Sequence, residues 1–153
     1  MMTYIINQRA NTVFRTGFGK QENIDIYIFE RALVDAHNII ESITRNVPIN
    51  IFSILGMRNL SAFIGEIFAR SLAKESDGRF IGNPHQDGYP DLLLMNDDGV
   101  RAYESIRAAA GLRDKSPFSP FPNGGLEIKA TCGSVPPPAK CAKLGIEKPD
   151  IGD

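Results

Sequence analysis

Apolar residues recur at steps of three and four positions in two long stretches of the chain. The first spans about residues 25–46 and predicts an amphipathic helix, because its apolar side chains fall on one face. Pro48 ends this helix, since the residue before a proline is pushed out of the helical conformation. The second runs from Asn59 or Ser61, either of which can cap a helix, to about Lys74. The apolar positions are Phe29, Leu33, Ala36, Ile40, Ile43 and Val47, then Leu60, Phe63, Ile64, Ile67, Phe68 and Leu72.

Toward the C-terminal end of the chain, apolar and polar residues alternate strictly instead of recurring at helical steps. Residues 126–131, L-E-I-K-A-T, alternate apolar with polar side chains, which predicts a strand with one buried face. Tyr89–Met95 predicts a second strand, opened by Pro90, which cannot donate to a ladder. Arg79–Ile81 predicts a short third strand. Helices and strands together therefore favour a mixed fold.

A shorter helix is predicted over Val100–Ala110, with Asp98 as its N-cap. This helix and the residues just after it form the most basic neighbourhood of the chain. Its cations are suited to phosphate contacts, although a solvated helix face is the default interpretation. They are Arg101, Arg107, Arg113 and Lys115.

Composition places the chain among single-domain globular proteins. It has 153 residues, of which 42% are hydrophobic and 23% charged, and its formal net charge of −1 indicates no particular partner. We expect residues 1–21 to be a solvated, partly ordered terminus and residues 133–153, which are broken by prolines, to be a poorly ordered tail. No signal peptide or membrane-spanning run is predicted, so we expect a cytoplasmic protein in which Cys132 and Cys141 are free thiols.

Candidate chemistry lies where the two main predicted strands begin. The strand pattern puts Glu127 and Lys129 on the same side, two residues apart. Asp91 lies at the mouth of the other strand. If the strands are neighbours, the two carboxylates and the amine converge. Two hard carboxylates with a nearby lysine suit a Mg²⁺ ion and an activated water.

Pro90-Asp91, a spacer and Glu127-Ile128-Lys129 together resemble the PD-(D/E)xK nuclease signature, which is common among type II restriction endonucleases. The resemblance covers roughly residues 59–131. It includes a lone acid, Glu66, on the predicted helix before the signature, and the small residues around Glu66 predict a part-buried carboxylate that needs a partner. An ion pair between Glu66 and Arg70 is an equally good interpretation.

The resemblance implies an α/β (α+β) fold, with a restriction-endonuclease-like mixed sheet flanked by helices. Residues 1–153 would then form a single domain containing the N-terminal part of a nuclease core. That core is expected to be incomplete at its C-terminus, because few residues follow the Glu-x-Lys segment. We therefore expect a fragment, an early-ended reading frame or a degraded relative of a longer enzyme, with weak or absent activity of its own.

The same resemblance implies roles for individual residues. Asp91, Glu127 and the backbone carbonyl of Ile128 would bind Mg²⁺, and Lys129 would orient the attacking water or stabilise developing charge. Glu66 would bind metal-bound water or a second ion. The implied reaction is hydrolysis of double-stranded DNA by a homodimer, with a cognate DNA methyltransferase protecting the host. Asp87 is a rival to Asp91 for the metal.

Two interpretations compete with a nuclease. Residues 50–74 resemble a helix-turn-helix, which would make the chain a DNA-binding regulator without catalysis. Against this, the second helix carries apolar residues where a recognition helix needs polar ones. Alternatively, Glu127 and Lys129 are an exposed strand pair in an interaction module, and Asp91 merely follows a proline in a turn.

Overall fold

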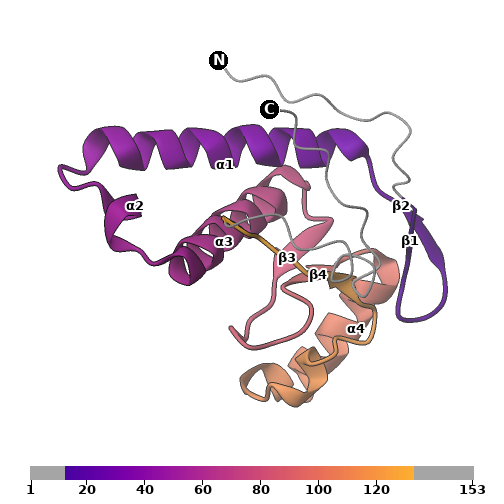
Figure 1. Cartoon of the computed structure of the whole chain (residues 1–153). Helices are drawn as coiled ribbons and strands as arrows, with labels where there is room; N and C mark the ends of the chain where they lie inside the picture. The colour runs from indigo at the N-terminus through magenta and orange to yellow at the C-terminus, as the bar shows by residue number, and fades with distance from the viewer. Residues whose placement is uncertain (1–12, 133–153) are drawn as a thin grey trace, which may run out of the picture.

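The computed structural model describes residues 13–132, and this part of the protein is a mixed α+β structure with four α-helices and two small antiparallel sheets (Figure 1). The two long helices pack against each other, and the signature residues flank the strands of the three-stranded sheet. In chain order the elements are β1 (Val13–Arg15), β2 (Gln21–Asn23), α1 (Ile26–Asn46), α2 (Ile51–Ile54), α3 (Met57–Glu75), β3 (Phe80–Gly82), β4 (Leu92–Leu94), α4 (Asp97–Ala108), the 3-10 turns η1 (Gly111–Arg113) and η2 (Ser116–Phe118), and β5 (Gly125–Leu126).

Helix α1 confirms the first periodic stretch. The side chain of Asp25 accepts a hydrogen bond from the backbone N–H of Tyr27 at 3.0 Å, which caps the first turn. The helix buries Ile28, Ala32 and Ala36 and ends at Asn46, two residues before Pro48.

Helix α3 confirms the second stretch, except that it starts at Met57, before either predicted cap. It packs along α1, and the two helices share a polar link. The hydroxyl of Ser71 donates to Asp35 at 2.8 Å, and Lys74 forms an ion pair with the same carboxylate. The hydrogen bond from Lys74 lowers the pKa of Asp35. Since Ser71 is buried, this link fixes the register of the two helices.

The main sheet has the order β3-β4-β5, and both pairings are antiparallel. The mixed sheet that we expected requires a parallel pair, and residues 13–132 contain none. Leu92 and Leu94 face the core formed with α1 and α3, and Leu93 faces a second cluster with Phe118 and Phe121. Both faces of β4 are therefore buried, so this strand is the rigid centre of the fold.

The strands are shorter than their sequence patterns. The predicted strand 89–95 is reduced to Leu92–Leu94, and the predicted strand 126–131 is reduced to Gly125–Leu126. The β4–β5 ladder ends because the backbone N–H of Ile128 donates to the side chain of Asp91, at 2.7 Å, instead of to a main-chain carbonyl.

Two local predictions were wrong. Residues 13–23 form the hairpin β1–β2, whereas the sequence analysis predicts a solvated, partly ordered terminus through residue 21 and no strand there. The N-cap of α4 is Asn96, whose side chain accepts from Gly99 N–H at 3.0 Å, because Asp98 is already engaged by Lys20 and Arg101.

The remaining predictions concern the ends of the chain and the membrane. The expectations for residues 1–12, for the tail 133–153 and for Cys141 lie outside the described residues, and Cys132 is a free thiol. Among the helices of residues 13–132, none has the length and apolar character that a bilayer crossing requires.

Candidate functional site

Asp91 is held on both sides at the N-terminal end of β4. Its backbone carbonyl accepts the N–H of Asn83 at 2.8 Å, and its carboxylate oxygen Oδ2 accepts the N–H of Ile128 at 2.7 Å. The second bond spans 37 positions of sequence. The carboxylate of Asp91 therefore points at the segment that carries Glu127 and Lys129.

The residues before Asp91 are fixed as firmly. Tyr89 donates its N–H to the carbonyl of Phe118 and accepts from the N–H of Phe121, each at 2.9 Å. The side-chain amide of Asn83 donates to the carbonyl of Pro90 at 2.9 Å and to that of Phe118 at 3.1 Å. Asn83 is thus a positioning residue that the sequence analysis missed. A loop asparagine close to the Pro-Asp pair was its only signal in the sequence.

Glu127 and Lys129 form an ion pair in which the lysine amine donates to Oε1 of the carboxylate. The Glu127 side chain is 28% exposed and that of Lys129 is 80% exposed. Oxygen Oε2 of Glu127 is buried, and in the described part of the chain it has no hydrogen-bond partner. A buried carboxylate oxygen without a partner is costly unless a cation or water satisfies it.

The geometry leaves one oxygen of each acid for a cation. Asp91 uses Oδ2 on Ile128, and Glu127 uses Oε1 on Lys129. The other oxygens, with the backbone carbonyl of Ile128, are hard donors of the kind that Mg²⁺ prefers. Residues 13–132 contain no cluster of three or more His, Cys, Asp or Glu side chains, so a cation held by Asp91 and Glu127 would need further ligands from carbonyl groups and water.

Glu66 is not where the sequence placed it. Its neighbour Gly65 does allow a close approach, since a Cβ there would lie 3.4 Å from Cβ of Ala130. Glu66 itself is exposed on α3, so the prediction of a part-buried carboxylate was wrong. The reason is the helix period, because the adjacent Ile67 takes the buried position. Within residues 13–132, no ion pair joins Glu66 to Arg70 or to Lys129.

Asp87, the rival acid, lies in the exposed turn between β3 and β4. No ion pair involves it within the described residues, and no hydrogen bond fixes its direction there. Asp91 is therefore the acid that the fold aims at the Glu-x-Lys segment.

A cavity of about 320 Å³ opens between α1, α3 and the segment 127–130. Glu127, Lys129 and His37 contribute its polar side chains, and its walls are mainly apolar. Low-dielectric walls strengthen the electrostatic interactions of the charged groups beside them. The residues that line it are Leu33, Ala36, His37, Ile40, Ile64, Phe68, Glu127, Ile128, Lys129 and Ala130.

The pKa of Lys129 lies above its ordinary value, because the amine donates to Glu127, and the nearby charge of Asp91 adds to the effect. A raised folded-state pKa means that the pairing stabilises the fold below the pKa of the unfolded chain. This contribution is lost as the pH rises through the folded-state value. At neutral pH Lys129 is therefore a cation, not a proton acceptor.

We expect Glu127→Gln to lower the pKa of Lys129 toward its ordinary value, because the substitution removes the carboxylate but keeps the shape of the side chain. The measurement is an NMR titration of the lysine ε-carbon and ε-nitrogen signals. Lys74, whose pKa is raised by its hydrogen bond to Asp35, serves as an internal reference that should not move. An unchanged Lys129 titration in the variant would contradict the pairing.

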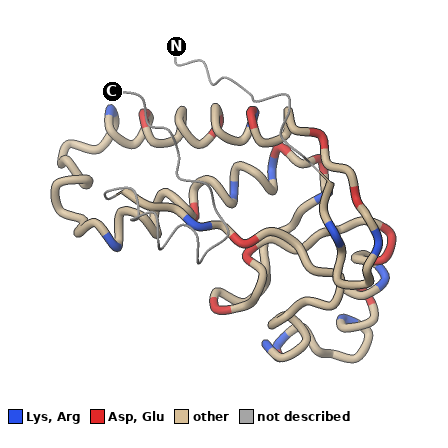
Figure 2. The backbone as a smooth tube through the Cα atoms, turned by 45° about the vertical axis from the view of Figure 1, so that its right-hand side comes forward, with Lys and Arg blue, Asp and Glu red and all other residues tan. Residues whose placement is uncertain are grey.

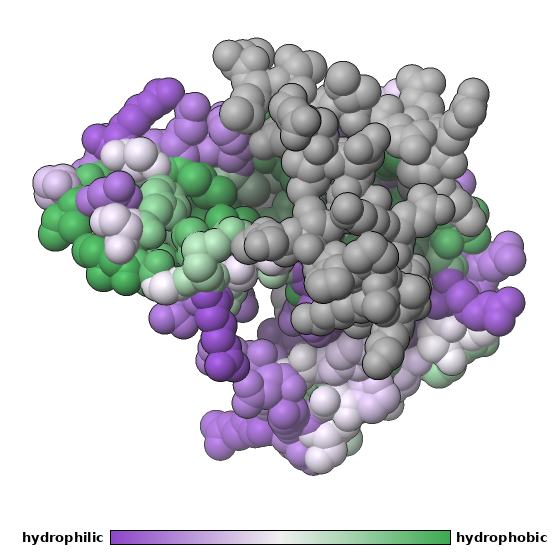
Figure 3. Space-filling view, viewed as in Figure 1, coloured by the Kyte–Doolittle hydropathy of each residue, from purple (hydrophilic) through white to green (hydrophobic). Residues whose placement is uncertain are grey.

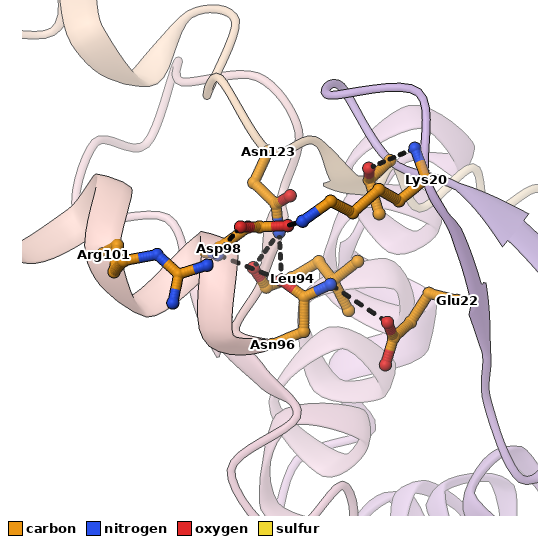
Figure 4. Close-up of polar contacts among 9 residues, drawn as sticks. Lys20, Glu22, Leu94, Asn96, Asp98, Arg101 and Asn123 are labelled. Carbon is orange, nitrogen blue, oxygen red and sulfur yellow. Dashed lines mark hydrogen bonds and ion pairs between the residues drawn. The ribbon is translucent and has the colours of Figure 1, made fainter.

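A second polar cluster at the other end of β4 has a structural role (Figure 4). The amide of buried Asn123 donates to the carbonyl of Leu94 at 2.9 Å and to Oδ1 of Asn96 at 2.8 Å. Lys20 and Arg101 reach Asp98 from either side, and both hydrogen bonds lower the pKa of Asp98. The amide of Asn123 therefore anchors the loop that delivers β5, and Lys20 and Arg101 share the carboxylate of Asp98.

Charges of both signs are interspersed along the chain, so local pairing decides which cations are available (Figure 2). Arg101 and Arg107 form ion pairs with Asp98 and Glu104 on α4. Arg113 and Lys115 are exposed, and within the described residues no acid pairs with either. Their loop adjoins the loop before Asp91, since a ring nitrogen of His85 lies 3.1 Å from the carbonyl of Leu112.

The geometry agrees with the helix-turn-helix interpretation in one respect and disagrees with it in two. A short helix and a long helix do flank a turn at Gly56, but α2 has only four residues. Helix α3 buries Ile67 and Leu72 in the core instead of presenting them for recognition.

In comparisons with known proteins, no protein-family model, no curated protein and no solved structure matches the chain.

Proposed function

We propose that this chain is a Mg²⁺-dependent endonuclease that hydrolyses phosphodiester bonds in double-stranded DNA, with a site like that of type II restriction endonucleases. One observation carries the proposal. The carboxylate of Asp91 accepts the N–H of Ile128, so it lies beside the Glu127–Lys129 ion pair. An accidental strand pair gives the Glu127–Lys129 contact but does not require the aspartate.

A bound Mg²⁺ would polarise the scissile phosphate and lower the pKa of a water molecule. Asp91 and Glu127 would hold the ion through the oxygens that they do not use on Ile128 and Lys129. The hydrogen bond to Ile128 fixes the direction of Asp91 before any substrate arrives, which avoids reorganisation during the reaction.

Lys129 would act as an electrostatic group. Its raised pKa keeps the amine protonated, so it can donate to a phosphate oxygen or to the attacking water and offset developing charge. General-base catalysis by an amine requires the opposite shift. We leave Glu66 out of the ligand set, since it is exposed on α3.

Arg113 and Lys115 supply the second support for a nucleic-acid substrate. Their cations are exposed on a loop that contacts His85, in the turn before Asp91, whereas Arg101 and Arg107 are engaged by acids on their own helix. Contacts of such cations with phosphates release counterions and favour DNA binding without sequence information.

The full proposal includes the partners of a restriction system. Cleavage of both strands at a two-fold sequence suits a homodimer, and a cognate DNA methyltransferase would protect the host DNA. Both follow from the proposed activity.

The test is incubation of unmethylated plasmid and phage DNA with the purified chain. We expect weak cleavage with Mg²⁺ and none after EDTA, with activity restored by added Mg²⁺, because the two acids need the ion to approach a phosphate. Absence of cleavage by a folded chain, with no change of the Glu127 and Lys129 NMR signals on adding Mg²⁺, would overturn the proposal. Sequence-specific binding that persists in EDTA would favour the regulator.

A further inference from the structure

The proposed cleavage of DNA assigns no ligand to the cavity between α1, α3 and residues 127–130. Its volume of about 320 Å³ lies at the lower end of the range of ligand pockets, roughly 300–1,000 Å³, so it suits a small molecule. Ile40 and Ile64 line it from the halves of α1 and α3 that are joined through α2. Figure 3 shows hydrophobic side chains gathered over this end of the molecule. The walls therefore favour a ligand with an apolar body.

Two charged groups of opposite sign lie side by side in the lining of this cavity. The amine of Lys129 donates to Oε1 of Glu127, whereas Oε2 is buried and accepts no hydrogen bond within residues 13–132. An ammonium group has three N–H donors, so the bond to Oε1 leaves Lys129 able to donate to a ligand as well. The third polar side chain, His37, has a ring nitrogen 3.4 Å from the carboxylate of Glu41 on its own helix. The pair of Glu127 and Lys129 thus presents an acceptor next to a donor.

A neutral amide matches this pair better than an ion does. An amide N–H can donate to Oε2 of Glu127 while the amide carbonyl accepts from the amine of Lys129. A carboxylate on the ligand would be repelled by Glu127, and an ammonium group would be repelled by Lys129. Either ion would also lose its hydration against the apolar walls, which costs more than the burial of a neutral amide.

We propose that this cavity binds a small neutral molecule that has an apolar ring and an amide or lactam group, with the amide bridging Oε2 of Glu127 and the amine of Lys129. Binding of this kind does not depend on the proposed nuclease activity, because neither DNA nor a metal ion takes part. Oε2 is also the oxygen left for Mg²⁺ in the proposed site, so binding is measured without divalent ions. For a probe of about nine non-hydrogen atoms we expect a Kd on the order of 1 mM.

An NMR titration of the wild-type chain with benzamide, in EDTA and without DNA, tests the proposal. Benzamide should shift the methyl signals of Ile64 and Ile128 until they saturate, and its ring protons should show NOEs to both, because these residues line the cavity. The methyl signals of Ile106, which packs in the cluster on the other face of β4, should not move. Benzoate, which carries a charge, and acetamide, which lacks the ring, should each bind at least about 10-fold more weakly.

A substitution that fills the cavity provides the second measurement. Ile40→Trp should raise the Kd of benzamide more than about 10-fold, because the larger side chain takes the space that the ring needs. Val34→Trp is the matched control, since Val34 is a 38% exposed aliphatic residue on the same helix and does not line the cavity. Its Kd should stay within about twofold of the wild type.

Circular dichroism establishes whether each variant is folded, and the three probes on the wild-type chain decide the matter even if Ile40→Trp does not fold. Shifts that never saturate, equal affinity for benzoate and benzamide, or NOEs only to residues outside the cavity would overturn the proposal. So would a folded Ile40→Trp variant that binds benzamide like the wild type. Benzamide binding without DNA cleavage would refute only the proposed nuclease, and cleavage by a chain that does not bind benzamide would refute only the ligand site.

Discussion

Asp91→Asn should reduce Mg²⁺-dependent DNA cleavage more than about 100-fold, since losing even a residue that only supports a metal ligand costs about 10- to 100-fold. The amide keeps the size of the carboxylate, and its oxygen can still accept the N–H of Ile128, so the fold should persist. What disappears is the negative charge that a divalent cation requires. Initial rates of plasmid cleavage at several Mg²⁺ concentrations measure the effect.

The matched control is Asp87→Asn, which makes the same change in the neighbouring turn. Asp87 is exposed, and no ion pair holds it in the described part of the chain, so cleavage should stay within about twofold of the wild type. The reverse outcome, with Asp87→Asn inactive and Asp91→Asn active, would assign the metal to the turn. Equal loss in both variants would contradict a site centred on Asp91.

Gly125→Ala should destabilise the fold by about 3 kcal/mol, at the upper end of the usual cost of forcing an atom into a packed site. A Cβ at this position would lie 1.8 Å from the carbonyl oxygen of Leu92, which is backbone and cannot move aside. The pairing of β4 with β5 must then separate, and Glu127 and Lys129 move away from Asp91. Urea denaturation followed by circular dichroism measures the loss, and DNA cleavage should fall with it.

Gly82→Ala is the control for this experiment. Gly82 pairs with Leu92 from the other side of β4, but a Cβ there meets nothing within 4 Å. We expect a stability change within about 0.5 kcal/mol, because alanine fits the open space and restricts the unfolded chain. Similar losses in both variants would show that steric pressure on β4 is not the cause.

The helices were predictable because their signal is local. Each turn of α1 and α3 repeats the apolar pattern, so residues 25–46 and 59–74 were located to within about two residues, the usual scatter of helix ends. The predicted strands were too long, because alternation of apolar and polar residues shows which side chains are buried but not where the hydrogen-bonded ladder ends. Leu126 and Ile128 do contact the core, but the ladder stops between them where Asp91 intervenes.

The sequence predicted which residues form the candidate site but not the contacts that hold them together. The signature named Asp91, Glu127 and Lys129, but the bond from Ile128 to Asp91 depends on the register of strands far apart in sequence. Asn83 and Asn123, which position the two segments, were missed because loop amides follow no periodic pattern. Glu66 was misjudged because residues one step apart on a helix face different surroundings.

The long segment of chain between β4 and β5 has a consequence for biosynthesis. Asp91 leaves the ribosome well before Ile128, which follows 37 positions later and donates its N–H to the Asp91 carboxylate. Loop closure of this length precedes any gain from the contacts that it makes. A nascent chain therefore carries its acids apart until translation has passed the Glu-x-Lys segment. Asp91 and the Glu-x-Lys segment can therefore meet only on polypeptides that have been synthesised past that segment.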